Sequence, residues 1–252
     1  MGDRMTILLT GGTGFVGLNV TEVLLGRGQH VVTFSNQAPP ARAVEAFARL
    51  PGTFDHVVGD VRDRAAIERV FGEFSIDRIV HGAAITPNDA RERADPSSIL
   101  EVNLLGLVNI LMAARDCPVS RILYIGSSGV FGQVDATELT EDHPQQPRSL
   151  YGISKSAGEA AFKRLSDLYG LKAVIGRLGW VFGRWEWETG ARDKLSAIHQ
   201  VTRCAREGGR AVLPQANLCD WTYAPDAAAN LTALLFADRP RHRVYNLGPG
   251  AL

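Results

Sequence analysis

A glycine-rich turn near the N-terminus narrows the possible folds more than any other segment. The sequence TGGTGFVG places Gly11, Gly14 and Gly17 between a short apolar run and a segment of helical periodicity. Glycines at such a junction let the backbone approach a pyrophosphate, whose charge is favoured at a helix N-terminus. No Gly-Lys-Ser/Thr follows, as a phosphate-donor P-loop would require. We therefore expect a dinucleotide-binding turn, with a turn that serves only packing as the alternative. Its expected residues are Gly11, Thr13, Gly14, Phe15, Val16 and Gly17.

Strand-like and helix-like segments alternate through the first two thirds of the chain. Strands are expected at 5–10, 30–34, 54–59, 78–84, 121–126 and 172–178, and helices at 15–28, 41–50, 63–74, 96–115 and 150–168. The strands are largely apolar, which is typical of a parallel sheet covered by helices on both faces. Right-handed crossovers then predict an α/β Rossmann-type, doubly wound parallel sheet.

The alternation changes after residue 178. Loops become longer, and the pattern predicts helices at 194–207 and 225–237 with the apolar segment AVLP at 211–214 between them and a strand at 243–248. We divide the chain into an NAD(P)-binding Rossmann domain at 1–178 and a small substrate-binding lobe at 179–252. The lobe is expected to cover the carboxyl edge of the sheet, where ligands bind in such folds.

Composition excludes several other classes of protein. The 252 residues are 45% hydrophobic with a formal net charge of +0, and no basic tract indicates a nucleic-acid partner. The three cysteines form no C-x-x-C pair, which disfavours a disulfide framework or a metal site. No apolar run reaches 18 residues and no secretory leader precedes the first strand. We expect a cytoplasmic protein with no metal and no membrane partner.

The end of the second strand bears on the choice between NAD and NADP. An acidic residue there would bind the adenosine ribose hydroxyls and repel a 2′-phosphate. This chain has Ser35 and Asn36 instead, so both NAD and NADP remain possible cofactors. Arg42 is either a partner for a 2′-phosphate or a solvated surface residue.

Residues after the third and fourth strands are placed to contact the cofactor. Asp60 and Val61 follow the third strand, where a carboxylate can accept the adenine amino group or simply form the turn before a helix. Ala83 and Ala84 end the fourth strand with small side chains, as a close cofactor requires. His81 is interpreted as a packed strand-end histidine rather than as a base.

A tyrosine and a lysine lie four residues apart after the fifth strand, in the sequence LYGISK. On one helix this spacing places Tyr151 and Lys155 on the same face. A tyrosine ionises near pH ~10, so it acts as a base at neutral pH only if its phenolate is stabilised. Ser127, at the end of the fifth strand, is placed to hold a substrate hydroxyl or carbonyl.

The motifs TGGTGFVG, GDVRD, HGAA, VNLLG, SSGVFG, YGISK and RLGWVFG occur in one order. This set resembles the extended short-chain dehydrogenase/reductase family, specifically the NAD-dependent epimerase/dehydratase branch, which acts largely on nucleotide sugars. The resemblance covers residues 5 to about 250.

The resemblance implies a role for each matching residue. Tyr151 would be the acid/base, and Lys155 would bind the nicotinamide ribose and lower the tyrosine pKa. Ser127 would orient the substrate beside Ser128, and Asn103 would serve local structure or a water relay near the cofactor. The implied chemistry is hydride transfer between an alcohol carbon and nicotinamide, with Tyr151 moving the hydroxyl proton. In an epimerase the ketone then rebinds on its other face and takes the hydride back.

Departures from the family pattern concern the substrate. Cys219 stands where relatives often carry a diphosphate-binding arginine, and Trp180 replaces an asparagine. Asp-Glu does not follow Ser127, which disfavours a dehydratase. Arg184 and Trp185 are candidates for sugar or phosphate contact, or for structural cover of the lobe. Family members continue for several tens of residues after VYNLGPG, so the resemblance implies a truncated lobe.

Three hypotheses follow from these observations. The first is an NAD(P)-dependent epimerase of a sugar or nucleotide sugar. The second is a net dehydrogenase or reductase of a non-nucleotide sugar or small hydroxy compound, which Cys219 and Trp180 favour. The third is a redox-sensing binding protein, which the retained Tyr151 and Lys155 disfavour. A homodimer through helices 96–115 and 150–168 is also expected from the resemblance.

Overall fold

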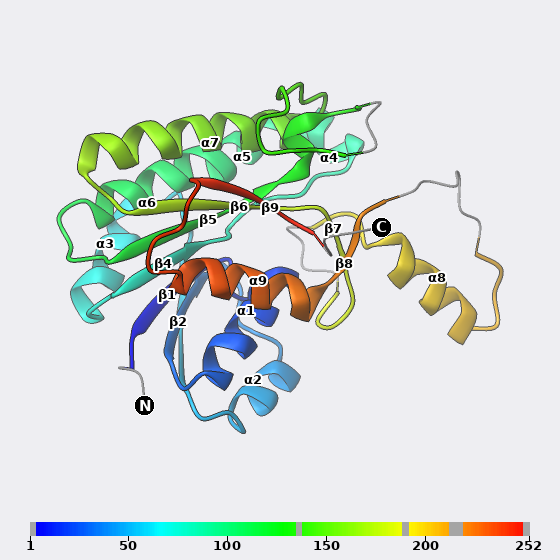
Figure 1. Ribbon diagram of the computed structural model, residues 1–252. Helices are drawn as coiled ribbons and strands as arrows, with labels where there is room; N and C mark the ends of the chain where they lie inside the picture. Colours follow the sequence, from blue (N-terminus) through cyan, green and yellow to red (C-terminus); the bar gives the residue numbers. More distant parts are fainter. Residues whose placement is uncertain (1–3, 135–137, 188–191, 212–218, 249–252) are drawn as a thin grey trace.

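The computed structural model describes residues 4–134, 138–187, 192–211 and 219–248. Its centre is a seven-stranded parallel sheet in the order β3-β2-β1-β4-β5-β6-β9, shown in Figure 1. The strands are β1 (Thr6–Thr10), β2 (His30–Ser35), β3 (Thr53–Val58), β4 (Arg78–His81), β5 (Arg121–Ser127), β6 (Ala173–Leu178) and β9 (Val244–Leu247). The predicted Rossmann-type doubly wound sheet is therefore confirmed. The strand order reverses between β1 and β4, and ligands bind at such a switch point.

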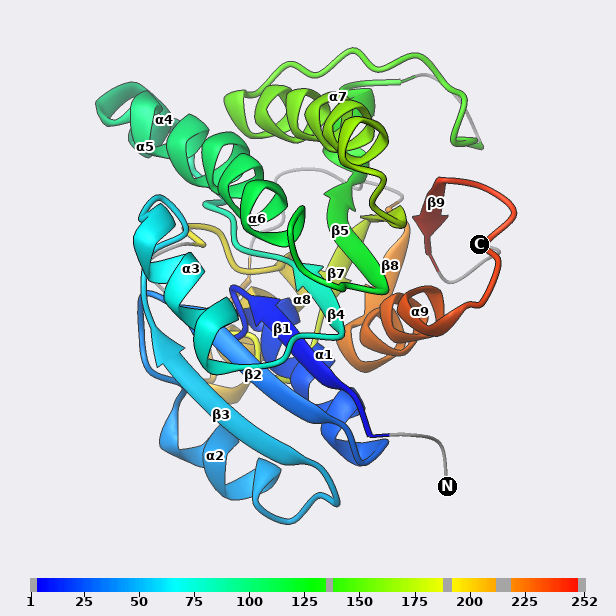
Figure 2. The same ribbon diagram turned by 90° about the vertical axis from the view of Figure 1, so that its left-hand side faces the viewer.

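Helices cover both faces of the sheet (Figures 1 and 2). One face carries α3 (Arg64–Glu73), α5 (Pro96–Leu100), α6 (Gly106–Ala114) and α7 (Leu150–Tyr169), and the other carries α1 (Phe15–Gly26), α2 (Ala41–Phe47) and α9 (Ala224–Phe236). Successive strand residues point to opposite faces, so Leu8 joins one hydrophobic cluster while Ile7 and Leu9 join the other. This two-sided burial explains why the strands are apolar throughout.

The helix predicted at 96–115 is interrupted in the structure. After α5, residues Glu101–Leu105 form one π-helical turn, and α6 follows. A short helix that the sequence did not indicate, α4 (Asp89–Ala94), precedes them. The span Pro96–Ala114 is long and apolar enough to cross a membrane by length and composition, but core helices pass the same test. Leu107, Ile110 and Leu111 of this span are fully buried against the sheet, as in a core helix.

The segment after residue 178 contributes to two places. α9 packs against α1, and β9 extends the main sheet beside β6. β7 (Trp180–Phe182) and β8 (Trp221–Tyr223) form a separate parallel pair that the sequence did not predict. The apolar segment at 211–214 falls largely outside the described residues. The division into domains at residue 178 stays a prediction.

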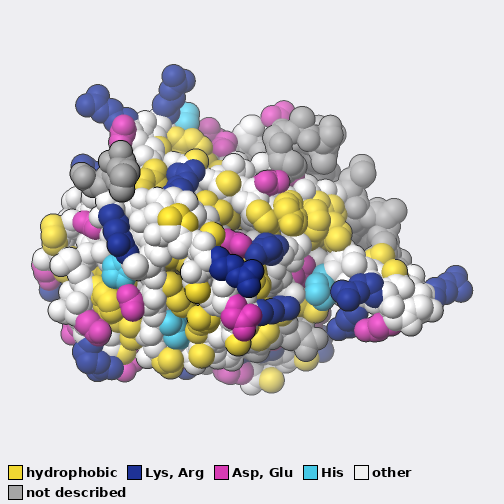
Figure 3. All heavy atoms as spheres, turned by 90° about the horizontal axis from the view of Figure 1, so that it is seen from below, with side chains coloured by type: hydrophobic (Ala, Val, Ile, Leu, Met, Phe, Trp, Pro, Cys, Tyr) yellow, Lys and Arg dark blue, Asp and Glu magenta, His cyan; other side chains and the backbone are white. Residues whose placement is uncertain are grey.

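One helix, α8 (Ala197–Arg206), projects from the body of the molecule and buries none of its residues (Figures 1 and 3). On the face seen in Figure 3, basic and acidic side chains are interspersed, in line with the zero formal net charge.

Helix α7 begins and ends at residues suited to those positions. The Ser149 side chain accepts a hydrogen bond from the Gly152 N–H at 3.1 Å, which caps the helix start. Gly170 ends it in the left-handed conformation, with φ of 68°. The cap fixes the first turn, so Tyr151 and Lys155 share one face of a helix, as their spacing predicted.

Candidate active site

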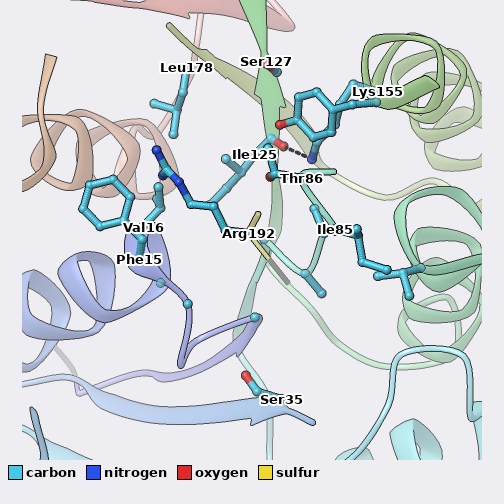
Figure 4. Close-up of a pocket in the computed structure, with 18 of the residues that line it drawn as sticks. Phe15, Val16, Ser35, Ile85, Thr86, Ile125, Ser127, Lys155, Leu178 and Arg192 are labelled. Carbon is cyan, nitrogen blue, oxygen red and sulfur yellow. Dashed lines mark hydrogen bonds between the residues drawn. The ribbon is translucent and has the colours of Figure 1, made fainter. Parts of the chain in front are cut away.

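One cavity of about 740 Å³ lies at the carboxyl edge of the sheet. It extends from Ser35 and Asp60 at one end, past the glycine-rich turn, to Ser127 and Tyr151 at the other. Figure 4 shows Ser35 and Ser127 at opposite ends of the view. A dinucleotide has the same elongated form, with a diphosphate between two riboses.

The glycine-rich turn is shaped to admit a ligand. A Cβ atom at Gly11 would lie 2.7 Å from the Ala83 nitrogen, and one at Gly17 would lie 2.2 Å from the Gly11 carbonyl oxygen. Gly14 caps α1 without a side-chain hydrogen bond, so the first N–H groups of the helix lack a side-chain acceptor from their N-cap residue. These N–H groups and the helix dipole suit a diphosphate, and the turn therefore fits a dinucleotide.

The glycines allow a direct test of this fit. Gly17→Ala is expected to weaken NAD binding at least ten-fold, because its methyl group would displace the turn that holds the diphosphate. Gly26→Ala is the matched control in the same helix, since a Cβ there meets nothing within 4 Å. It should leave binding unchanged and add roughly 0.5 to 1 kcal/mol of stability. Calorimetric titration with NAD and thermal unfolding measure the two effects, and equal affinities would contradict the expectation.

The adenosine end of the cavity has no carboxylate at the end of β2. The Ser35 hydroxyl accepts a 3.3 Å hydrogen bond from the Thr13 N–H, and Asn36 lines the cavity beside it. Arg42 lies with its guanidinium 5.7 Å from the ring centre of Trp185 and is not a cavity residue among those described.

Asp60, Val61, Ala83 and Ala84 all line the cavity, as the sequence predicted. The Asp60 carboxylate is bound by the Arg62 guanidinium at 2.7 Å, and this hydrogen bond lowers the pKa of Asp60. The carboxylate is therefore already engaged by an arginine at the adenine end.

Two sequence candidates serve the structure around the cavity. His81 is fully buried, its Nδ1 lies 2.8 Å from the Thr10 hydroxyl, and burial lowers its pKa to about 3. It is thus a neutral packed histidine, as interpreted. Asn103 lies in the π-helical turn, accepts from the Ile85 N–H at 2.7 Å and donates to the Ser154 hydroxyl at 3.0 Å. It joins the loop after β4 to α7 and is not among the described residues that line the cavity, so its predicted part in binding the cofactor stays a prediction.

The other end of the cavity gathers three hydroxyl groups and an ammonium group. Tyr151 comes from the first turn of α7, Ser127 from the end of β5 and Thr86 from the loop after β4. Lys155 is 3% exposed, and its ammonium group donates to the Ile125 carbonyl oxygen at 2.9 Å (Figure 4). The structure therefore brings the predicted catalytic residues together at one place.

The environment of Tyr151 differs in part from what the resemblance implies. Burial raises its pKa, while hydrogen bonding to Ser127, the positive charge of Arg192 and hydrogen bonding to Thr86 lower it. The Lys155 ammonium group lies 5.9 Å from the Tyr151 ring centre and donates to the Ile125 carbonyl oxygen, and its effect on the Tyr151 pKa stays a prediction. Burial also lowers the pKa of Lys155 to about 8.

Sequence reasoning missed Thr86 and Arg192. Thr86 lies two residues after the HGAA motif, and its backbone forms a β-bridge with Arg192. This bridge joins the segment of Arg192 to the loop after β4 at the cavity, and no local sequence pattern marks it. A polar residue shortly after a strand end was the single signal available for Thr86.

The candidates for substrate contact divide into two groups. Ser128 and Trp180 line the cavity, and Trp180 is 56% exposed at its rim. Arg184 and Trp185 are not among the described cavity residues, because both side chains bind the carboxylate of Glu22 on α1, the guanidinium at 2.7 Å and the indole N–H at 2.8 Å. Structural cover is the role that these contacts give them.

Comparisons with known proteins agree with this geometry. The model of the NAD dependent epimerase/dehydratase family matches residues 7–248. A UDP-glucose 4-epimerase of Corynebacterium glutamicum is 30% identical over 262 residues, which cover 98% of this chain and 76% of the relative. The crystal structure of the Thermus thermophilus UDP-glucose 4-epimerase with NAD is 29% identical with a TM-score of 0.82, covering 98% of this chain and 78% of that one. The Bordetella bronchiseptica enzyme WbmG with NAD is 27% identical with a TM-score of 0.80, covering 98% and 73%.

Proposed function

We propose that this enzyme epimerises a hydroxyl-bearing carbon of a sugar or nucleotide sugar, because the chain belongs to the NAD dependent epimerase/dehydratase family. Family membership and the similar NAD-bound structures support NAD as the cofactor. The observation that carries the proposal is that Tyr151 forms hydrogen bonds with Ser127 and Thr86 in the cavity that the buried Lys155 also lines.

The proposed chemistry follows from these side chains. When bound, a nicotinamide accepts and returns a hydride at its C4 atom. The Tyr151 oxygen takes the proton of the substrate hydroxyl during oxidation and gives it back during reduction. The Ser127 and Thr86 hydroxyls hold the Tyr151 oxygen in line, and the Lys155 ammonium group would bind the nicotinamide ribose.

A panel of substrates separates this proposal from its alternative. The enzyme is incubated with NAD or NADP and with UDP-sugars and free sugars in turn. Isomer formation without net growth of reduced nicotinamide absorbance supports an epimerase. Net growth of that absorbance supports a dehydrogenase or reductase of a non-nucleotide sugar or small hydroxy compound. The second outcome is favoured by Trp180 and Cys219, which stand where nucleotide-sugar enzymes often carry polar or charged partners.

We also expect the cofactor preference to depend on the end of β2. Ser35→Asp should weaken NADP binding at least ten-fold and change NAD binding only a few-fold, because the new carboxylate repels a 2′-phosphate and can accept from ribose hydroxyls. Calorimetric titration of Ser35→Asp and of its control with NAD and with NADP measures these affinities. Ala38→Asp, three residues further along and not among the described cavity residues, is the position control and should change neither affinity. A Ser35→Asp variant that still binds NADP as tightly as the unmodified enzyme would contradict the role of this position.

A homodimer through α5, α6 and α7 remains part of the proposal. Exposed apolar side chains on these helices and on the turn between them support it, namely Leu100, Leu105, Ile153 and Leu168.

A further inference from the structure

We propose that Arg192 binds the diphosphate of the dinucleotide, from the side of the cleft opposite the N-terminus of α1. The inference rests on the proposed function, because it concerns how this chain holds the cofactor that the function needs. It adds a cation from the C-terminal segment to a turn whose own residues carry no charge.

Arg192 faces the same cavity as the glycine-rich turn. Both line it, and the guanidinium carbon of Arg192 lies 4.8 Å from the ring centre of Phe15. Figure 4 shows the side chain extending from the middle of the cavity toward Phe15. Phe15 is the first residue of α1, so the ring that the guanidinium contacts belongs to the helix whose N-terminal N–H groups suit a diphosphate.

The charge of Arg192 also reaches the catalytic end of the cavity. The positive charge of Arg192 lowers the pKa of Tyr151, whereas burial raises it. A dinucleotide that runs from Ser35 over the turn to Tyr151 carries its diphosphate between the two riboses. A cation that lies between Phe15 and Tyr151 is therefore next to the phosphate on the nicotinamide side.

Arg192 is held in place by its own segment. Its Nε donates to the Lys194 carbonyl at 2.8 Å, and one Nη lies 3.3 Å from the carboxylate of Glu186, which has no solvent exposure. Glu186 in turn accepts from the Ser196 hydroxyl at 2.7 Å. The backbone bridge to Thr86 adds a second attachment. A guanidinium fixed in this way loses less side-chain freedom when it binds a phosphate, and its planar N–H fork suits phosphate oxygens.

The other arginines that line the described part of the cavity bind carboxylates away from the glycine-rich turn. Arg62 binds Asp60 at the adenine end, and Arg91 binds Asp193 at 3.1 Å. The contact with Phe15 therefore distinguishes Arg192 as the residue suited to the diphosphate.

The test compares the binding of three nucleotides to Arg192→Met by calorimetric titration. NAD and ADP-ribose contain both phosphates, whereas AMP contains only the phosphate on the adenosine side. We expect the Kd for NAD and for ADP-ribose to rise roughly ten-fold or more, because a charge-assisted hydrogen bond is lost, while the Kd for AMP changes less than about two-fold. Arg192→Lys keeps a point charge, so its Kd for NAD and for ADP-ribose should lie between those of Arg192→Met and of the unmodified protein.

Arg184→Met is the matched control. It removes a cation of the same kind from the same segment, but its guanidinium binds Glu22 on α1 and not the cavity. We expect unchanged affinity for all three nucleotides, with thermal unfolding used to show that each variant is folded. If Arg184→Met lost as much affinity for NAD and ADP-ribose as Arg192→Met, the effect would come from how the segment that carries both arginines packs on α1. That result would overturn the inference. Unchanged NAD and ADP-ribose affinity in Arg192→Met would also overturn it. An unmodified protein that binds neither NAD nor NADP would instead overturn the proposed function.

Discussion

Tyr151→Phe is expected to lower kcat by roughly 10²- to 10⁴-fold on whichever substrate the panel identifies, since this is the range that general acid–base catalysis contributes. The change removes only the oxygen that moves the proton. Affinity for NAD and the thermal unfolding temperature should stay close to those of the unmodified enzyme. In the oxidation direction the phenolate is the active form, so the rate should rise as pH passes upward through the pKa of Tyr151. That rise should be absent from the variant.

Tyr124→Phe is the matched control for this experiment. Tyr124 is also a tyrosine close to Lys155, whose ammonium group lies 4.8 Å from its ring centre. Its side chain is fully buried, and its hydroxyl has no hydrogen-bond partner in the described part of the chain. Removing that hydroxyl should leave kcat within about two-fold, because an unpaired buried polar group contributes nothing favourable. A Tyr151→Phe enzyme as fast as this control would show that the proposed proton transfer is wrong.

Glu159→Ala is expected to cost about 3 to 5 kcal/mol of unfolding free energy, because it leaves the guanidinium of Arg177 buried without its partner. The two side chains are 1% and 2% exposed, and both oxygens of Glu159 accept from Arg177 at 2.8 Å. For a chain of this length the loss corresponds to a fall of roughly 6 to 20 °C in the unfolding temperature. Thermal unfolding followed by circular dichroism measures it.

A surface ion pair provides the comparison for Glu159. Arg64 and Glu68 lie four residues apart on α3, and their side chains are 43% and 52% exposed. Glu68→Ala should change the unfolding free energy by less than about 1 kcal/mol, since solvent screens exposed charges. If Glu159→Ala and Glu68→Ala unfolded at the same temperature, the buried pair of Glu159 and Arg177 would not hold α7 to β6 as its geometry indicates. Glu159 lies one helical turn beyond Lys155, on the face of α7 that carries the proposed catalytic residues.

The parts of this protein that sequence reasoning found are those encoded by neighbouring residues. Gly11, Gly14 and Gly17 mark the turn by their spacing at a strand–helix junction, and a Cβ at Gly17 would meet the Gly11 carbonyl oxygen at 2.2 Å. Helical spacing puts Tyr151 and Lys155 on one face, but their assignment and that of Ser127 came from the ordered set of motifs that carries the family resemblance. The doubly wound sheet follows from alternating segments, each of which carries its own pattern.

The parts that it missed depend on contacts between distant loops. Arg192 reaches the cavity through a bridge to Thr86, which lies more than 100 residues earlier. Arg184 was a candidate for substrate, yet its charge is matched by Glu22 on another element, and a sequence pattern does not identify such a partner. The π-helical turn at Asn103 was likewise hidden, because its spacing differs from that of an α-helix by a single residue.

The packing of α9 on α1 has a consequence for how the protein is made. The helix that begins at the glycine-rich turn buries Leu18, Leu24 and Leu25 in the cluster that also contains Leu231 and Leu235. During synthesis, residues 1–178 leave the ribosome before the segment that covers them. The face of α1 that packs on α9 therefore reaches its native surroundings only when the chain has been translated beyond α9, and until then this apolar face is open to chaperones or to other nascent chains.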